Sequence, residues 1–377
     1  MDYENKSVLQ IGEDEIIKWG RDNKFPNYLL EIVNDSESLN SLMQQKLDMA
    51  SGLRLVFVEE RIIGNRLRKE RVEDKDLENW FLQNHIQSKV SKILMDLIIF
   101  NNAWFEFSPK SNGTIEGNNL DVTECRLVKK KGRSSSQSVI IGDWDKYYFE
   151  PDMFRKIPLL DVFARTPTKK ENSAIHIKLK TSGFPHYNIP SWTGSIDWVE
   201  ISKSIGSFHK NGLKNAYQMK YHIQVPMSFV ERTNSSLQET KRKVISEFDE
   251  AVGGVENWNK SFISFSDDLP RDTKKVKPRE IKIEKIPSKI HDKAYLKVHN
   301  HASRVLARGI LIDPTISGIE KEKNLSSGYE FKDKFNALLV YQFNMIRRLA
   351  LKPINMMKNH DFPDKRDIKI AFVDRGF

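Results

Sequence analysis

The sequence of 377 residues contains a single cysteine, Cys125, so no disulfide can form within the chain, and no Cys/His array has the spacing of a zinc site. Long apolar runs are also missing. The longest strongly apolar stretch, residues 93–100, is interrupted by Asp96 and is too short to span a bilayer. The start, MDYENKSVLQ, lacks the basic and then apolar segments of a secretory signal peptide. We therefore expect a soluble protein, inside a cell or in a particle, with no membrane partner.

The motifs that mark the common enzyme classes are absent as well. The sequence has no phosphate-binding glycine-rich loop, no dinucleotide-binding GxGxxG after a strand and no GxSxG nucleophile elbow. His299 and His301 would point about 200° apart on a helix, so they cannot share a metal ion. Asp143 and Asp145 in GDWD fit a turn, where aspartates accept backbone hydrogen bonds. We therefore predict no catalytic residue, no metal site and no cofactor.

Positive charge is abundant, and it is concentrated. The chain has 61 Lys and Arg against 51 Asp and Glu, a net charge of +10. Residues 271–310 alone hold twelve Lys or Arg against four Asp or Glu, a net of +8. Such a concentration of cations usually faces a polyanion such as nucleic acid.

The segment 289–310, KIHDKAYLKVHNHASRVLARGI, predicts a helix with two distinct sides. Steps of three and four residues place its basic side chains on one face; they are Lys289, Lys293, Lys297, His301, Arg304 and Arg308. An apolar stripe on a different side is interpreted as the packing face; its members are Tyr295, Val298, Ala302, Val305 and Leu306. A solvated surface helix would have the same pattern, so the cationic face alone does not prove a binding surface.

Hydrophobic periodicity and turn residues predict a mixed α+β chain. Helices are expected at 26–33, 73–100, 193–213, 289–310 and 329–357. A further helix is expected to start at an N-cap residue, Asp35 or Ser36, and to end at Gly52. Pro353 should bend or limit the helix at 329–357. Strands are expected at 53–59, at 103–107 with further antiparallel strands to about residue 180, and at 367–374, where the strand needs a partner elsewhere. Residues 214–286 predict a small α/β unit inserted between two helices.

Three blocks, taken in this order, carry a family resemblance. They are WGRDNKFPNYLLEIVNDSESLNSLMQQKLDMASGL at 19–53, FNNAWFEF at 100–107, and YNIPSWTGSIDWVEISKSIGSFHKNGLKNAYQMKYHI at 187–223, followed by the long helix after a Gly/Ser loop. In this order they resemble portal proteins of tailed bacteriophages, in particular short portal-type sequences from phages of Bacteroidetes. The resemblance covers most of the chain.

The resemblance implies a division of the chain into parts. These are an N-terminal arm at 1–25, a wing of helices and antiparallel sheet at 26–192, a first stem helix at 193–213, an α/β clip at 214–288, a second stem helix at 289–310, a tunnel loop at 311–328, and a long helix with a C-terminal wing strand at 329–377. Little sequence follows residue 357, so the crown of larger portals is expected to be minimal or absent.

It also implies a function that is not enzymatic. Portal subunits form a ring of about twelve copies at one capsid vertex. Double-stranded DNA is packaged and ejected through this channel. The expected partners are other copies of the chain, DNA, terminase, the major capsid protein and a neck, adaptor or tail protein. The expected locations are the portal vertex of the virion and, during assembly, the host cytoplasm.

Three groups of residues are expected to matter for DNA. The stem stripe is expected to face the channel or the clip–stem surface through some of Lys289, Lys293, Lys297, Arg304 and Arg308. The tunnel loop contributes Lys321, Lys323 and Asn324. The clip carries a basic patch of Lys274, Lys275, Lys277 and Arg279.

Other functions compete with the portal interpretation. A DNA-binding protein acting as a monomer or dimer would also be basic, but it needs a recognition helix beside a compact scaffold. A nuclease would use GDWD or the histidines with a divalent metal. A head–tail adaptor would form a ring too, although adaptors are usually much shorter.

Overall fold

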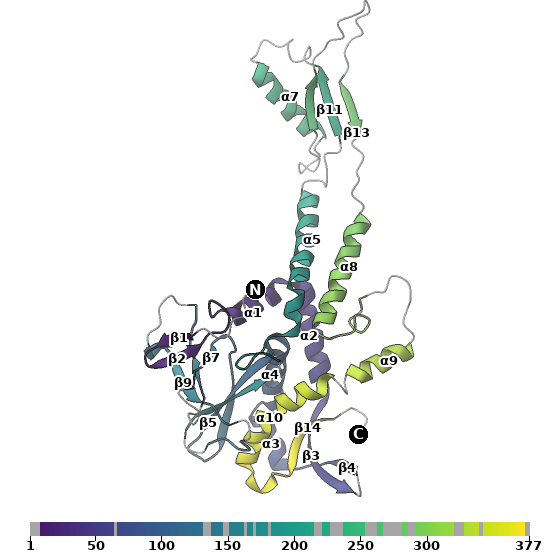
Figure 1. Ribbon diagram of the computed structural model, residues 1–377. Coiled ribbons are helices and arrows are strands. Elements are labelled where there is room, and N and C mark those ends of the chain that lie inside the picture. The colour runs from purple at the N-terminus through teal and green to yellow at the C-terminus, as the bar shows by residue number, and fades with distance from the viewer. Residues whose placement is uncertain are drawn as a thin grey trace, which may run out of the picture. The chain divides into compact units, whose positions relative to one another are not determined.

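The computed structural model describes residues 8–63, 66–130, 137–145, 151–161, 164–168, 171–179, 182–214, 221–226, 237–252, 262–266, 281–285, 292–319, 328–338 and 342–373. The chain divides into two compact units (Figure 1). We call residues 1–199 with 303–377 the body, and residues 200–302 the inserted unit.

The helices of the body begin and end largely where the sequence predicts. They are α1 (Phe25–Asp35), α2 (Glu37–Ser51), α3 (Lys75–Gln83), α4 (Ile86–Phe100), α9 (Gly328–Ala337) and α10 (Phe343–Asp361). Pro26 lies in the first turn of α1, where its missing N–H costs nothing. The Ser36 hydroxyl accepts a hydrogen bond of 3.3 Å from the Leu39 backbone N–H and so caps α2. The predicted restart of the helix at this point is confirmed.

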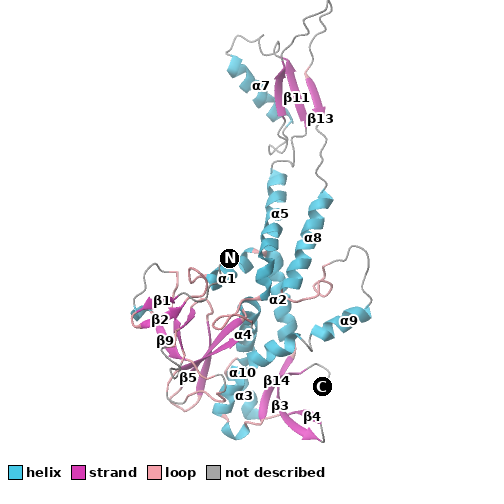
Figure 2. Cartoon of the chain, viewed as in Figure 1, coloured by secondary structure: helices cyan, strands magenta, loops and turns pink. Residues whose placement is uncertain are grey.

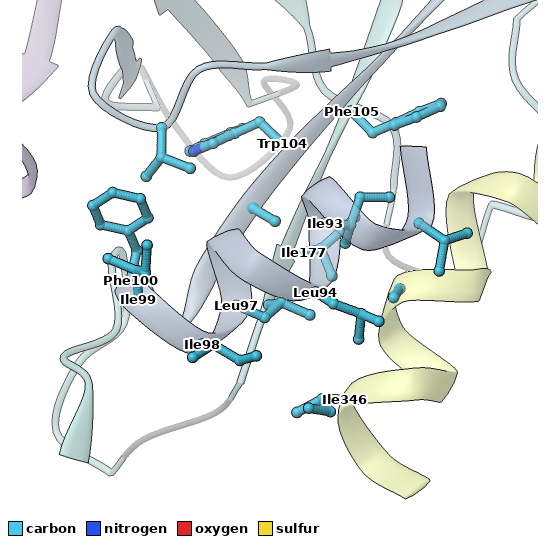
Figure 3. Close-up of a cluster of buried hydrophobic side chains, with 14 of the residues drawn as sticks. Ile93, Leu94, Leu97, Ile98, Ile99, Phe100, Trp104, Phe105, Ile177 and Ile346 are labelled. Atoms are coloured by element: carbon cyan, nitrogen blue, oxygen red, sulfur yellow. The ribbon is translucent and has the colours of Figure 1, made fainter. Parts of the chain in front are cut away.

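The core of the body is built around α4. The second half of this helix, from Ile93 to Phe100, is buried on nearly all sides, whereas its first half has exposed polar residues such as Gln87 and Ser88. Figure 3 shows its side chains gathered against neighbours from β5, β10 and α10, with the labelled residues Ile93, Leu94, Leu97, Trp104, Phe105, Ile177 and Ile346. These side chains belong to one large buried cluster that also includes Trp19, Trp192 and Phe343.

Within the described part of the body, the strands form four small sheets (Figure 2). Their orders are β1 (Val8–Ile11) with β2 (Asp14–Ile17); β10 (Ser173–Lys178), β5 (Asn102–Pro109) and β6 (Ile115–Leu120); β14 (Ile368–Val373), β3 (Arg54–Ile63) and β4 (Arg66–Arg71); and β7 (Cys125–Leu127), β8 (Ser138–Ile141) and β9 (Arg155–Pro158). All strand pairs in these sheets are antiparallel. The predicted combination of helices and antiparallel sheet is confirmed.

The C-terminal strand β14 has the distant partner that the sequence required. It pairs with β3, with Ile370 opposite Phe57. On the other edge of β14, the Asn355 side chain of α10 donates a hydrogen bond to the Ile370 carbonyl and accepts one of 2.8 Å from the Ile370 N–H. A side chain thus takes the place of a further strand at this position and covers the open edge.

Several predicted boundaries are wrong. The helix expected at 73–100 is two helices, because His85 adopts a left-handed backbone conformation with φ of 51°. The helix expected at 329–357 is described as α9 and α10, with residues 339–341 outside the described part. Pro353 does not end α10, which continues to Asp361 with the proline ring buried. The strand expected at 53–59 is longer and is followed by β4, which the sequence analysis missed.

Two of the sequence blocks quoted above meet in space, and this meeting explains their composition. The Trp19 ring stacks on Tyr187, with centroids 4.4 Å apart. The buried Arg126 guanidinium donates to the Asn23 side-chain oxygen at 2.7 Å and also to the Asn23 carbonyl. The Tyr187 hydroxyl donates to the Ile17 carbonyl and accepts from the Leu127 N–H. Burial lowers the pKa of Arg126 to about 10 and raises the pKa of Tyr187.

The inserted unit contains two helices that continue into the body. They are α5 (Ile196–Lys214) and α8 (Asp292–Gly309), and between them lie β11 (Tyr221–Pro226), α7 (Leu237–Val252), β12 (Phe262–Ser266) and β13 (Lys282–Lys285). The sheet order is β12-β11-β13, parallel on one side of β11 and antiparallel on the other. Ile223, Val225 and Val244 form a small core between this sheet and α7. The elements occur where an inserted α/β unit was expected, while the names stem and clip stay predictions.

Candidate nucleic-acid interface

The packed side of α8 is formed by small and apolar residues at helical spacing. Ala302, Leu306 and Ala307 are buried. Within the inserted unit, Tyr295 contacts His209 of α5 edge to face, with ring centroids 5.8 Å apart and an interplanar angle of 78°. The contact places one side of α8 against α5, and the two helices lie side by side (Figure 1).

The cationic stripe lies on the outward side of α8 as far as the structure describes it. Lys297 and Arg308 are exposed, and neither has a hydrogen bond or ion pair with any described residue. Arg304 is half-buried and His301 is exposed, and both interact with neighbouring groups. Lys297 and Arg308 are eleven positions apart, which corresponds to about 16 Å along a helix axis. Phosphates of one DNA strand follow each other at about 3.4 Å along the duplex axis, so two cations at this separation would contact phosphates that are several nucleotides apart.

The remaining predicted DNA residues fall outside what the structure describes. Lys293 belongs to α8, but its side chain is not described. The other residues lie outside the described ranges; they are Lys289, the tunnel-loop residues Lys321, Lys323 and Asn324, and the basic patch Lys274, Lys275, Lys277 and Arg279. Their roles stay predictions.

The predicted packing stripe of α8 is wrong at one position. Val298 was assigned to the packing side, but 42% of its surface is exposed. Leu296 has an even larger exposed fraction, 58%, and the sequence analysis did not single it out. Tyr295, Ala302 and Leu306 do lie on the packed side. The helical spacing places both exposed apolar residues beside the cationic stripe, one on each side of it.

The C-terminal end of α8 is held by the body through its last carbonyl groups. The Ser191 hydroxyl donates a 2.9 Å hydrogen bond to the Gly309 carbonyl, and the Lys46 ammonium of α2 donates to the Ile310 carbonyl. A side chain at Gly309 would meet the Ser195 hydroxyl at 2.6 Å, so only glycine fits this approach. Leu311 then turns the chain with a left-handed φ of 63°. These contacts fix where the helix ends.

Lys46 is the residue that sequence reasoning missed here. Burial lowers the pKa of its ammonium group to about 8. Its neighbour Gln45 donates to the Ile316 carbonyl, so two consecutive residues of α2 hold the segment that follows α8. Nothing in the sequence near Lys46 marks this role, because its partner lies more than 250 positions away. A cation at the carbonyl end of a helix is favourable in any case.

The alternative catalytic candidates have structural explanations. In GDWD, the Asp145 N–H donates to the Asp143 carboxylate at 3.0 Å, the expected turn geometry, and Asp145 forms an ion pair of 3.1 Å with Lys24. Trp144 is buried and donates to the Glu124 carbonyl. Within the described ranges, no group of three or more His, Cys, Asp or Glu side chains is placed to hold a metal ion.

Cys125 is buried in β7, as a small core residue would be. Burial raises the pKa of its thiol well above the ordinary value. Among the described helices, none is both long enough and apolar enough to cross a membrane.

Comparison with solved structures identifies the fold. A chain from the virion of a native gene transfer agent particle matches 96% of this chain and 86% of its own length, with a TM-score of 0.61 and 12% identity. A chain from the neck of a native particle of this kind, computed with C12 symmetry, covers 97% of this chain and 88% of its own length with the same score and identity. At this identity the match shows the fold alone.

A portal protein is also among the matches. The HK97-family phage portal protein from Corynebacterium diphtheriae covers 93% of this chain and 95% of its own length, with 8% identity and a TM-score of 0.43, too low to carry an argument by itself. No family model matches the sequence, and no curated protein matches it either. The chain thus shares its fold, over nearly its whole length, with chains from the neck of a gene transfer agent particle.

Proposed function

We propose that the chain is a subunit of a portal ring, through which double-stranded DNA enters and leaves a capsid. The single observation that supports this most is the exposed cationic stripe of α8, carried on a fold that is shared over nearly its whole length with a particle-neck chain. A lone helix whose Lys297 and Arg308 have no partner among the described residues is a weak polyanion site. A ring repeats the same helix once per subunit and surrounds the duplex.

The chemistry of the stripe suits passage better than tight binding. Lysine and arginine side chains contact phosphates, and these contacts carry no sequence information. DNA can then move past them, because each phosphate that leaves a cation is replaced by the next one. The portal also serves as the docking platform for terminase, the major capsid protein and a neck, adaptor or tail protein. It resides at the capsid vertex of the virion.

Particle mass distinguishes this function from its rivals. We expect native mass spectrometry of the purified chain to give a species of about twelve subunits. A monomer or dimer that binds DNA would favour the non-enzymatic DNA-binding protein instead. Cleavage of DNA by the purified chain, dependent on a divalent metal, would favour the nuclease.

The DNA contact can be tested separately from the ring. The double variant Lys297→Glu, Arg308→Glu reverses the two free cations of α8. Rings of this variant are expected to lose most of the affinity of the stripe for duplex DNA and to show a shallower dependence of binding on salt. The matched control is Arg21→Glu, Lys75→Glu, which makes the same change in charge at two exposed positions of the body. Equal loss of DNA binding in both double variants would contradict a role for the stripe.

A further inference from the structure

The three consecutive residues 296–298 of α8 point in three different directions, and all three are exposed. We propose that Leu296 and Val298 are contacts between neighbouring copies of the chain, one on each flank of α8, and that Lys297 between them faces the ring axis. The proposal rests on the proposed ring and adds to it which positions of α8 join subunits and which line the channel.

Helix geometry separates the three side chains. Successive residues are rotated by about 100°, so Leu296 and Val298 each lie about 100° from Lys297 and about 160° from each other. The cations that follow at steps of three and four fall near Lys297, within the same sector. One cationic face is thus bordered by an apolar side chain on either flank.

Both flanks are uncovered in the single chain. The exposed fractions are 58% for Leu296 and 42% for Val298. The contact of α8 with α5 in the inserted unit lies elsewhere, at Tyr295 with His209. Leu296 and Val298 therefore take no part in the aromatic-ring contact between the two helices, and both side chains are accessible to a partner.

Two patches on opposite flanks point to a second copy and not to a different partner. A single partner bound to one flank would leave the other flank uncovered. In a closed ring every subunit has one neighbour on each side, and such a head-to-tail interface joins two different patches of the same chain. Only this arrangement covers both side chains with one kind of contact.

Charge substitutions at adjacent positions separate the two roles. Leu296→Glu, Val298→Glu places carboxylates on both flanks, and we expect the fraction of chain in rings to fall about tenfold or more. Lys297→Glu alters the position between them; its rings are expected to form normally and to bind duplex DNA less tightly. Far-ultraviolet circular dichroism verifies that α8 is retained in both variants.

Cross-linking tests the direction of the contact. Cys125 is buried, so introduced thiols at the surface react selectively. In the double variant Leu296→Cys, Val298→Cys, a short bismaleimide is expected to join chain to chain and give a ladder of covalent multimers. Each single variant is expected to give almost none, because the two flanks of a head-to-tail contact present different residues.

The outcomes distinguish the failure of this inference from the failure of the proposed function. If the unaltered chain forms no ring, the proposed function fails. If the unaltered chain forms rings and the double variant Leu296→Glu, Val298→Glu forms them equally well, the assignment of the flanks is wrong. The same holds if the single cysteine variants cross-link as efficiently as the double variant. In both cases the proposed ring is not contradicted.

Discussion

The body and the inserted unit differ in how completely they bury their apolar side chains. Around α4 the body encloses leucines, isoleucines and aromatic residues from helices and sheets in one cluster. In the inserted unit the described core consists of three buried residues, and Leu296, Val298 and Ile283 are exposed. The body also exposes single apolar side chains, such as Leu82 at 69%, but its described core is far larger. The subunit contacts proposed for α8 would cover two of the exposed side chains of the inserted unit.

Truncating one leucine in each region tests this difference most strongly. Leu94→Ala in α4 removes a fully buried side chain, so the free energy of unfolding is expected to fall by about 2 to 5 kcal/mol. Leu296→Ala removes the same atoms from the surface of α8 and is expected to change the stability of the single chain by about 0.5 kcal/mol or less. Urea denaturation of both variants measures the two values. Equal losses would contradict the comparison.

A smaller loss of stability is expected when the hydrogen bonds of the Tyr187 hydroxyl are removed. Tyr187→Phe keeps the stack on Trp19 but removes the hydroxyl that bridges the Ile17 carbonyl and the Leu127 N–H. Two buried backbone groups then lose their partner, and we expect a loss of about 1 to 3 kcal/mol. Thermal unfolding followed by circular dichroism measures it. An unchanged midpoint would mean that the ring stack alone holds this region.

A further effect depends on pH and concerns a buried acid in the same core. Burial raises the pKa of Asp96 to about 7, against the opposing influence of Lys92, whose ammonium donates to it at 2.9 Å. The unfolded chain releases this proton near pH 4, so the free energy of unfolding falls as the pH rises from about 4 to 7, by about 1.4 kcal/mol for each unit by which folding raises the pKa. Asp96→Asn is expected to remove this decline. Denaturation series at several pH values measure the slope, and an unaltered slope would contradict it.

The helices and strands that could be predicted from the sequence are those marked by a local pattern of residues. Helix α8 and its cationic face follow from steps of three and four residues, and the capped start of α2 follows from Ser36. The strand β14 is predicted from the largely apolar segment IKIAFV, although its partner is not. These features need no knowledge of distant residues.

What the sequence could not predict depends on pairings between distant residues. Arg126 with Asn23, Lys46 with Ile310 and Asn355 with Ile370 have no local signal. The break at His85 was missed because no glycine or proline marks it. The charged strand β4 lacks the apolar alternation by which half-buried strands are recognised. Val298 was misassigned because periodicity gives the angle of a side chain but not whether a neighbour covers it.

The most direct test is an electron cryomicroscopy reconstruction of the purified chain. The account predicts a ring of about twelve copies in which Lys297 faces the axis while Leu296 and Val298 contact the adjacent subunits on either side. A monomer with both side chains in solvent would contradict it, and so would a ring in which Lys297 is buried between subunits.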